Sequence, residues 1–125
     1  MELFFCNHNV RSWGRKWKWM LDVLQHSPKL QHLTIHQEIE NGIYEDIWHY
    51  PQNIPTCISS QLRTCLFKGC KGMKSELQFA EYVMQNSKVL STMTIHSACS
   101  IDLTAKHRML KKLAESPRRC KLIFD

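Results

Sequence analysis

Cysteine and histidine are the side chains in this sequence with the widest scope for chemistry. The 125 residues include six cysteines and seven histidines, and such residues can bind metals, form disulfides or act as nucleophiles and bases. The cysteines show neither a Cys-x-x-Cys pair nor zinc-finger spacing: Cys6, Cys57, Cys65, Cys70, Cys99 and Cys120. We expect reduced thiols, mostly buried as small hydrophobes, and no metal or other cofactor; a Cys/His metal site stays the minor alternative.

No group of residues matches a known catalytic spacing. The pair Ser59-Ser60, Cys70 and the histidines do not place a nucleophile beside a base, and the four glycines make no phosphate loop. Gly69 and Gly72 are better interpreted as a turn between a strand and a helix, where glycine permits positive φ. The sequence therefore predicts a protein that is not an enzyme.

Segment 13–19 interleaves basic and aromatic residues, a pattern that can contact phosphates and stack bases. Basic residues cluster at 11–18, 68–74 and 106–121, and the net charge is +6. A basic nucleic-acid-binding module is therefore one alternative. We prefer solvated helix faces as the explanation of this charge, because Trp17 fits the apolar face of a helix.

One helix–strand unit can be followed in residues 17–35. Apolar residues first recur at the i, i+3, i+4, i+7 spacing of one helix face: Trp17, Met20, Leu21 and Leu24. Pro28 cannot continue a helix and disfavours helical geometry at the preceding residue, so the helix ends by about Ser27. An apolar-x-x-apolar-x-apolar pattern follows, whose second half alternates as a half-buried strand does: Leu30, Leu33 and Ile35.

The strand pattern recurs along the chain. Full or partial copies are Leu3/Phe5, Leu62/Cys65/Phe67, Leu90/Met93/Ile95 and Leu122/Phe124. Their last positions, 5, 35, 67, 95 and 124, are 30, 32, 28 and 29 residues apart. Such regular spacing predicts an α/β fold of leucine-rich-repeat type, a solenoid with parallel strands on one face and helices on the other.

Two further helices are expected between the strands. Ser75 and Gln78 resemble a capping box that opens a helix over 76–86. Asp102 or Thr104 can cap another helix that runs to about Glu115. The inward residues would be Leu77, Ala80, Val83 and Met84 in the first helix and Leu103, Leu110 and Leu113 in the second.

Residues 37–61 depart from the repeat. They contain two prolines and no convincing helix, and a long segment without regular structure is usually a functional loop or a misassigned element. We predict an irregular connection in which Ile43, Trp48 and Ile54 pack over the solenoid. A short turn would form near 57–60.

Residues 48–95 carry several motifs in a fixed order. They are Trp48, Pro55-Cys57-Ile58-Ser59-Ser60-Leu62, Gly69-Gly72, Glu76-Leu77-Phe79-Tyr82, Asn86-Leu90 and Met93-Thr94-Ile95. This set resembles the FBD domain of plant F-box proteins. Segment 116–125 resembles that family's C-terminal ending, and segment 19–35 is similar to the leucine-rich repeat that precedes an FBD domain. The resemblance implies terminal leucine-rich repeats in 1–36, an irregular connection in 37–61 and an FBD domain in 48–125 that continues the stack.

Proteins of this family resemble substrate receptors of cullin-RING ubiquitin ligases, in which an F-box docks on the Skp adapter and the repeats bind a target protein. Here Leu3 and Phe5 already fit a strand, so we expect no F-box, no docking on the adapter, and the tail of a longer protein. No apolar run approaches the roughly 20 residues of a membrane-spanning helix, and the N-terminus lacks a secretory signal pattern. We expect an intracellular protein, cytoplasmic or nuclear, with an unidentified protein target and no membrane.

Residues that flank the inward strand positions point to the opposite face of the sheet, here called the strand face. They form three rows: His32, Thr64, Thr92 and Lys121; Thr34, Leu66, Thr94 and Ile123; and His36, Lys68, His96 and Asp125. Solenoids commonly bind partners on such surfaces, so we predict that these residues contact the partner. His36 and His96 could sense pH or bind metal, although such residues are more often simply solvated.

The sequence thus predicts a protein–protein interaction module, by resemblance the target-recognition end of an F-box substrate receptor. Two alternatives stay open at this point. One is the basic nucleic-acid-binding module, and the other is a truncated remnant that lacks independent function.

Overall fold

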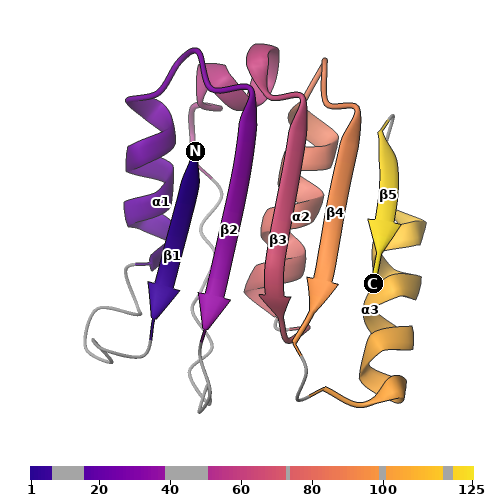
Figure 1. Cartoon of the computed structure of the whole chain (residues 1–125). Helices are drawn as coiled ribbons and strands as arrows, with labels where there is room; N and C mark the ends of the chain where they lie inside the picture. The colour runs from indigo at the N-terminus through magenta and orange to yellow at the C-terminus, as the bar shows by residue number, and fades with distance from the viewer. Residues whose placement is uncertain (7–15, 39–50, 73, 99–100, 117–119) are drawn as a thin grey trace.

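The computed structural model describes residues 1–6, 16–38, 51–72, 74–98, 101–116 and 120–125. Its strands are β1 (Glu2–Cys6), β2 (His32–Glu38), β3 (Thr64–Cys70), β4 (Thr92–Ser97) and β5 (Lys121–Phe124). They form one sheet in chain order, and every neighbouring pair is parallel. The helices, α1 (Lys16–Gln25), α2 (Lys74–Asn86) and α3 (Leu103–Glu115), all lie behind the same face of the sheet (Figure 1). The predicted α/β fold with a parallel sheet is confirmed.

Strands β2 to β5 share one register. The inward rows are Leu33, Cys65, Met93 and Leu122, and Ile35, Phe67, Ile95 and Phe124. In β2, β3 and β4 each of these side chains is only 1% exposed. The predicted alignment of positions 35, 67, 95 and 124 is therefore confirmed, because the period of two in each strand delivers the same rows to the core.

The predicted alignment of β1 is wrong by two residues. Leu3, rather than Phe5, pairs with Ile35, so the first interval is longer than the sequence pattern indicated. Backbone contacts at the N-terminus accompany this register. The ammonium group of Met1 donates to the carbonyl of His32 at 2.9 Å, and the N–H of Thr34 donates to the carbonyl of Met1 at 2.9 Å.

Helices α1 and α2 bury the predicted residues. Met20 and Leu24 of α1 are fully buried, and the helix ends at Gln25, as Pro28 requires. The four predicted inward residues of α2 are buried, as are Phe79 and Tyr82. Burial extends around α2 because it contacts α3 and the single π-type helical turn η2 (Cys57–Gln61).

The capping box predicted for α2 is wrong. The helix begins at Lys74, so Ser75 lies inside it and is 3% exposed. The buried carboxylate of Glu76 instead accepts the backbone N–H of Lys71, with Oε1 at 3.1 Å from the nitrogen. This contact ties the turn after β3 to the first turn of α2.

Helix α3 begins as predicted but buries a different face. The Asp102 carboxylate caps it by accepting the N–H of Ala105 at 2.8 Å. Met109 and Leu113, four residues apart on one helix face, are 2% and 0% exposed, whereas Leu103 and Leu110 are 71% and 38% exposed. The inward assignment of Leu103 and Leu110 is therefore wrong, because the core selects the face that carries Met109.

The connection before β3 is described only in part. Strand β2 continues to Glu38, beyond the predicted start of the connection at 37. Ile54 is 42% exposed, so its predicted packing over the sheet is wrong; Ile43 and Trp48 lie outside the described residues. The predicted short turn is present as η2. Within the residues described here, no helix is both long and apolar enough to cross a membrane.

Gly69 and Gly72 adopt the predicted positive φ angles, 79° and 83°. The predicted turn is wrong for Gly69, which lies within β3, where the pairing with β4 shifts between Lys68 and Cys70, as at a β-bulge. Gly72 follows the strand and lies against α3. A Cβ atom at Gly72 would be 2.9 Å from both Cγ and Sδ of Met109.

Replacing Gly72 with alanine should lower the free energy of unfolding by about 2–3 kcal/mol. A positive φ costs an L-residue about 1–2 kcal/mol, and crowding in a packed core adds about 1 kcal/mol or more. Urea unfolding measures the change. In a Met109→Ala background the crowding is absent, so the same substitution should cost about 1 kcal/mol less; an equal cost in both backgrounds would contradict the contact.

Candidate partner-binding surface

The strand face has the rows that the sequence predicted. His32, Thr64, Thr92 and Lys121 are register partners, as are Thr34, Leu66, Thr94 and Ile123. His36, Lys68 and His96 align in the third row. These side chains are exposed or half-buried, while their inward neighbours in β2 to β4 are buried. The geometry of the rows is thus confirmed, and their contact with a partner stays a prediction.

Asp125 completes the third row just beyond the end of β5. Its backbone N–H donates to the carbonyl of Ile95 at 3.0 Å, and its own carbonyl accepts both the N–H and the hydroxyl of Ser97 at 3.0 and 2.9 Å. Its carboxylate Oδ2 lies 3.2 Å from Nδ1 of His96. The chain therefore stays aligned with β4 through its last residue.

The histidines of the strand face each lie beside an oxygen atom. Nδ1 of His32 is 2.7 Å from the hydroxyl of Thr64, and Nε2 of His36 is 3.5 Å from Oε1 of Glu2. Sequence reasoning missed Glu2, because the two-residue displacement of β1 brings its carboxylate to this position. Carboxylates thus lie near both ends of the row that runs from His36 to His96.

The centre of the strand face combines apolar and hydrogen-bonding groups. Leu66 is half-buried between its register partners Thr34 and Thr94. Lys68 is exposed one row away on the same strand. Such a surface can contact an apolar side chain, hydrogen-bond a backbone and pair with a carboxylate.

Among its described residues, the strand face does not gather the side chains that a metal ion needs. His36 and His96 are separated by β3, so two strand spacings, about 10 Å, lie between them. Across the part of the chain that the structure describes, no three histidine, cysteine or acidic side chains are placed to hold a metal ion.

Four cysteines lie in the core as thiols rather than disulfides: Cys57, Cys65, Cys70 and Cys120. The prediction that the cysteines are buried is confirmed for these four. The side chains of Cys6 and Cys99 lie outside the described part. Burial raises the pKa of Cys65 to about 12, with a smaller contribution from nearby Cys120, and burial also raises the pKa of Cys57. A raised pKa disfavours the thiolate, so these residues are poor nucleophiles.

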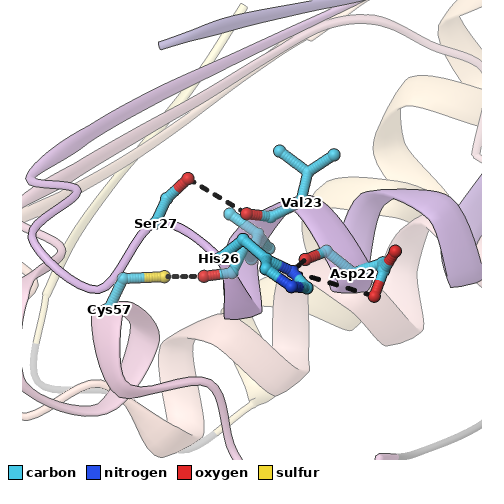
Figure 2. Close-up of polar contacts among 6 residues, drawn as sticks. Asp22, Val23, His26, Ser27 and Cys57 are labelled. Atoms are coloured by element: carbon cyan, nitrogen blue, oxygen red, sulfur yellow. Dashed lines mark hydrogen bonds and ion pairs between the residues drawn. The ribbon is translucent and has the colours of Figure 1, made fainter.

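The serine in each break of the repeat donates its hydroxyl to a backbone carbonyl of a helical segment. The Ser27 hydroxyl donates to the carbonyl of Val23 at 3.0 Å (Figure 2). The Ser116 hydroxyl donates to the carbonyl of Lys112 at 3.4 Å, and that of Ser87 crosses to the carbonyl of Ile58 in η2 at 2.8 Å. These bonds give a physical reason for the recurrence of serine before three strands.

A side-chain hydrogen bond joins α1 to η2, which belongs to the next repeat. The Cys57 thiol donates to the carbonyl of Leu24 at 3.3 Å, as Figure 2 shows beside the His26–Asp22 pair. Leu24 is in the last turn of α1. Its carbonyl also accepts the N–H of Ser27 at 3.1 Å, so the Cys57 thiol is a second donor to this carbonyl. Successive units are thus joined behind the sheet as well as through it.

The basic aromatic segment is described only at its end. Residues 7–15 lie outside the described part, as does the side chain of Trp17. Trp19 is 49% exposed on α1. The structure therefore adds no geometry in favour of a nucleic-acid site at 13–19.

Comparisons with known proteins agree with the family resemblance. An F-box/FBD/LRR-repeat protein of Arabidopsis thaliana is 35% identical over 124 residues, which cover 93% of this chain and 29% of that protein. A family model described as FBD matches residues 50–95. These matches support the plant FBD/LRR family for this chain. The matched FBD segment contains η2, β3 and α2, the central part of the fold.

Two more relatives from Arabidopsis thaliana also match most of this chain and a similar share of their own length. An FBD-associated F-box protein is 28% identical over 125 residues, covering 87% of this chain and 30% of that protein. Another F-box/FBD/LRR-repeat protein is 28% identical over 121 residues, covering 86% of this chain and 26% of that protein. The chain therefore spans less than a third of the length of these relatives. No solved structure matches it significantly.

The buried thiol of Cys65 should make stability fall in alkaline solution. Its folded-state pKa of about 12 exceeds the ordinary value of 9.0. The stabilisation that the protonated thiol gives the folded state is therefore complete below pH 9 and is lost as the pH rises towards 12. Between pH 8 and pH 10 wild type should lose about 1.4 kcal/mol more unfolding free energy than Cys65→Ala. Urea unfolding at both pH values measures this difference. Equal losses in wild type and Cys65→Ala would show that the folded state does not raise the pKa of Cys65.

Proposed function

We propose that this chain is a leucine-rich-repeat-like module that binds a target protein on its strand face. The carrying observation is the common register of β2 to β5, which aligns three rows of exposed or half-buried side chains across the sheet. The repeat spacing of about 30 residues and the helices behind one face support the solenoid interpretation. The names of the relatives, which include F-box and LRR, support a role in protein interaction.

Within a full-length family member, the module would serve target recognition by a ubiquitin-ligase receptor. The F-box in the names of the relatives supports this part of the proposal. Docking on the adapter would belong to the F-box, and the FBD-containing segment would supply target contacts. We place the function of this segment inside the cell.

The strand face favours an extended polypeptide as its target. Leu66 offers an apolar contact at the centre, and the threonine hydroxyls around it can hydrogen-bond a backbone. Lys68 on β3 and Lys121 on β5 would attract carboxylates of the target. Glu2 and Asp125 would repel such carboxylates at the two ends of the third row. The target would therefore present an apolar residue flanked by acidic ones.

Thr94→Arg should weaken binding of the target without unfolding the chain. The long cationic side chain would cover the centre of the strand face beside Leu66, so the affinity for a target should fall about tenfold or more, equivalent to about 1.4 kcal/mol. Quantitative affinity enrichment from plant extract identifies the proteins retained by wild type. Titration calorimetry with a purified candidate then gives the affinity.

The matched control is Gln85→Arg, which adds the same side chain at an exposed position on α2. A target of the strand face should be retained by this variant and lost by Thr94→Arg, while both variants unfold at the same urea concentration as wild type. Targets that bind Thr94→Arg and wild type equally would contradict the proposed surface.

A further inference from the structure

The middle row of the strand face alternates hydroxyl and apolar side chains from one strand to the next. Its members, in strand order, are Thr34, Leu66, Thr94 and Ile123. Leu66 is half-buried, and Ile123 is 39% exposed. Because β4 separates them, two strand spacings, about 10 Å, lie between these apolar side chains. A ligand that crosses the strands along this row therefore meets apolar surface at an interval of about 10 Å.

This interval fits one conformation of an extended ligand. A polyproline II helix has three residues per turn and a rise of about 3.1 Å per residue, so its side chains return to the same side about every 9.3 Å. The side chains of a β-strand return to one side about every 6.8 Å. Residues i and i+3 of a polyproline II segment can therefore contact Leu66 and Ile123 together, whereas same-side residues of a β-strand miss one of them.

The threonine hydroxyls favour polyproline II over an α-helix. Seven residues of an α-helix span about 10.5 Å, so the distance alone does not separate the two conformations. The carbonyl groups of an α-helix accept its own N–H groups, whereas those of a polyproline II segment are free to accept other donors. Among the described residues, the hydroxyls of Thr34 and Thr94 have no hydrogen-bond partner. Both hydroxyls are therefore available to carbonyl groups of the ligand.

The charged side chains where the strands begin are basic. Lys121 is exposed on β5, Arg63 is exposed directly before β3, and His32 is exposed on β2. The carboxylates of Asp22 and Glu115 belong to α1 and α3, which lie behind the sheet (Figure 1). A carboxylate of the ligand that points to this side of the middle row is therefore attracted.

The charges on the other side of the middle row are mixed. Lys68 is exposed on β3, but the carboxylates of Glu2 and Asp125 lie 3.5 and 3.2 Å from nitrogen atoms of His36 and His96. One ammonium group and two carboxylates thus face this side, which disfavours a second acidic residue there. The two residues between i and i+3 of a polyproline II segment point to opposite sides, so one of them should be acidic and the other uncharged.

We propose that the strand face binds a target segment in polyproline II conformation that crosses the strands along the middle row. Apolar residues i and i+3 of the segment contact Leu66 and Ile123, and its carbonyl groups accept the hydroxyls of Thr34 and Thr94. One acidic residue between the two apolar ones points towards Lys121. The inference rests on the proposed function and specifies the conformation and spacing of the target.

The test uses a fluorescein-labelled, proline-rich peptide with two leucines three residues apart and one glutamate between them, titrated with the full chain in fluorescence anisotropy. A peptide of the same composition with the leucines two residues apart should bind about tenfold more weakly, because only one leucine reaches its contact. Lysine in place of the glutamate should weaken binding about fivefold. Equal affinities for the two leucine spacings would overturn the proposal, as would tighter binding of an alanine-based helical peptide with leucines seven residues apart.

Ile123→Thr should remove the preference for one leucine spacing. The variant keeps the contact at Leu66 and loses the second one, so the two peptides should bind within about twofold of each other. The matched control is Val89→Thr, since Val89 is an exposed apolar residue in the turn before β4; it should keep the tenfold preference. Urea unfolding checks the folding of both variants. A tenfold preference that persists in Ile123→Thr would contradict the site.

Thr94→Arg separates a failure of this inference from a failure of the proposed function. The variant should weaken binding of the peptide about tenfold or more, because its side chain covers the path between Leu66 and Ile123. If the peptide does not bind wild type while target proteins are still lost by Thr94→Arg, the polyproline II inference is wrong and the proposed function stands. Targets retained equally by wild type and Thr94→Arg would contradict both.

Discussion

The alternating burial of side chains along β2, β3 and β4 is the constraint on which the rest of the structure depends. Six residues, two from each strand, are about 1% exposed and meet in two rows. Burial of each contributes roughly 1.5–3 kcal/mol, so a one-residue slip of the sheet, which would turn all six to solvent, would cost roughly 10 kcal/mol. That is comparable to the whole stability of a typical domain. The same register necessarily sets the three rows of the strand face.

Contacts behind the sheet hold the units at matching heights. The Ser87 hydroxyl bonds to Ile58 in η2, and the Cys57 thiol bonds to the end of α1. Glu76 and Gly72 constrain the turn between β3 and α2. Because these contacts lie on the helix side, substitutions on the strand face are free to change recognition with little effect on the fold.

The features that could be predicted from the sequence are local or periodic. Pro28 ends α1 through its own backbone restriction, Asp102 caps α3 through its own carboxylate, and the strand rows follow from a period of two. Leu110 was assigned inward because several apolar residues compete for the inside of α3. Packing against Gly72 and the sheet selects Met109 instead. Such a choice of helix face depends on tertiary contacts.

The alignment of β1 and the Glu2–His36 pair could not be predicted from the repeat pattern either. Leu3 and Phe5 each fit the strand position that pairs with Ile35, and the structure pairs Leu3 with it, together with backbone contacts of Met1 to β2. Of the candidate site, the rows were therefore predictable, because each belongs to a repeated strand. Of the two carboxylates beside the third row, Asp125 was predicted as its last member, whereas Glu2 was missed because it belongs to β1, whose register the repeat did not fix.

Isotope-edited NOE spectroscopy of the labelled chain tests the common register most directly. We expect backbone NOEs that join Phe67 to the neighbourhood of Ile35 on one side and of Ile95 on the other, in the pattern of parallel strands. Contacts shifted by one residue, or the pattern of antiparallel strands, would contradict the shared core rows and the strand face built on them.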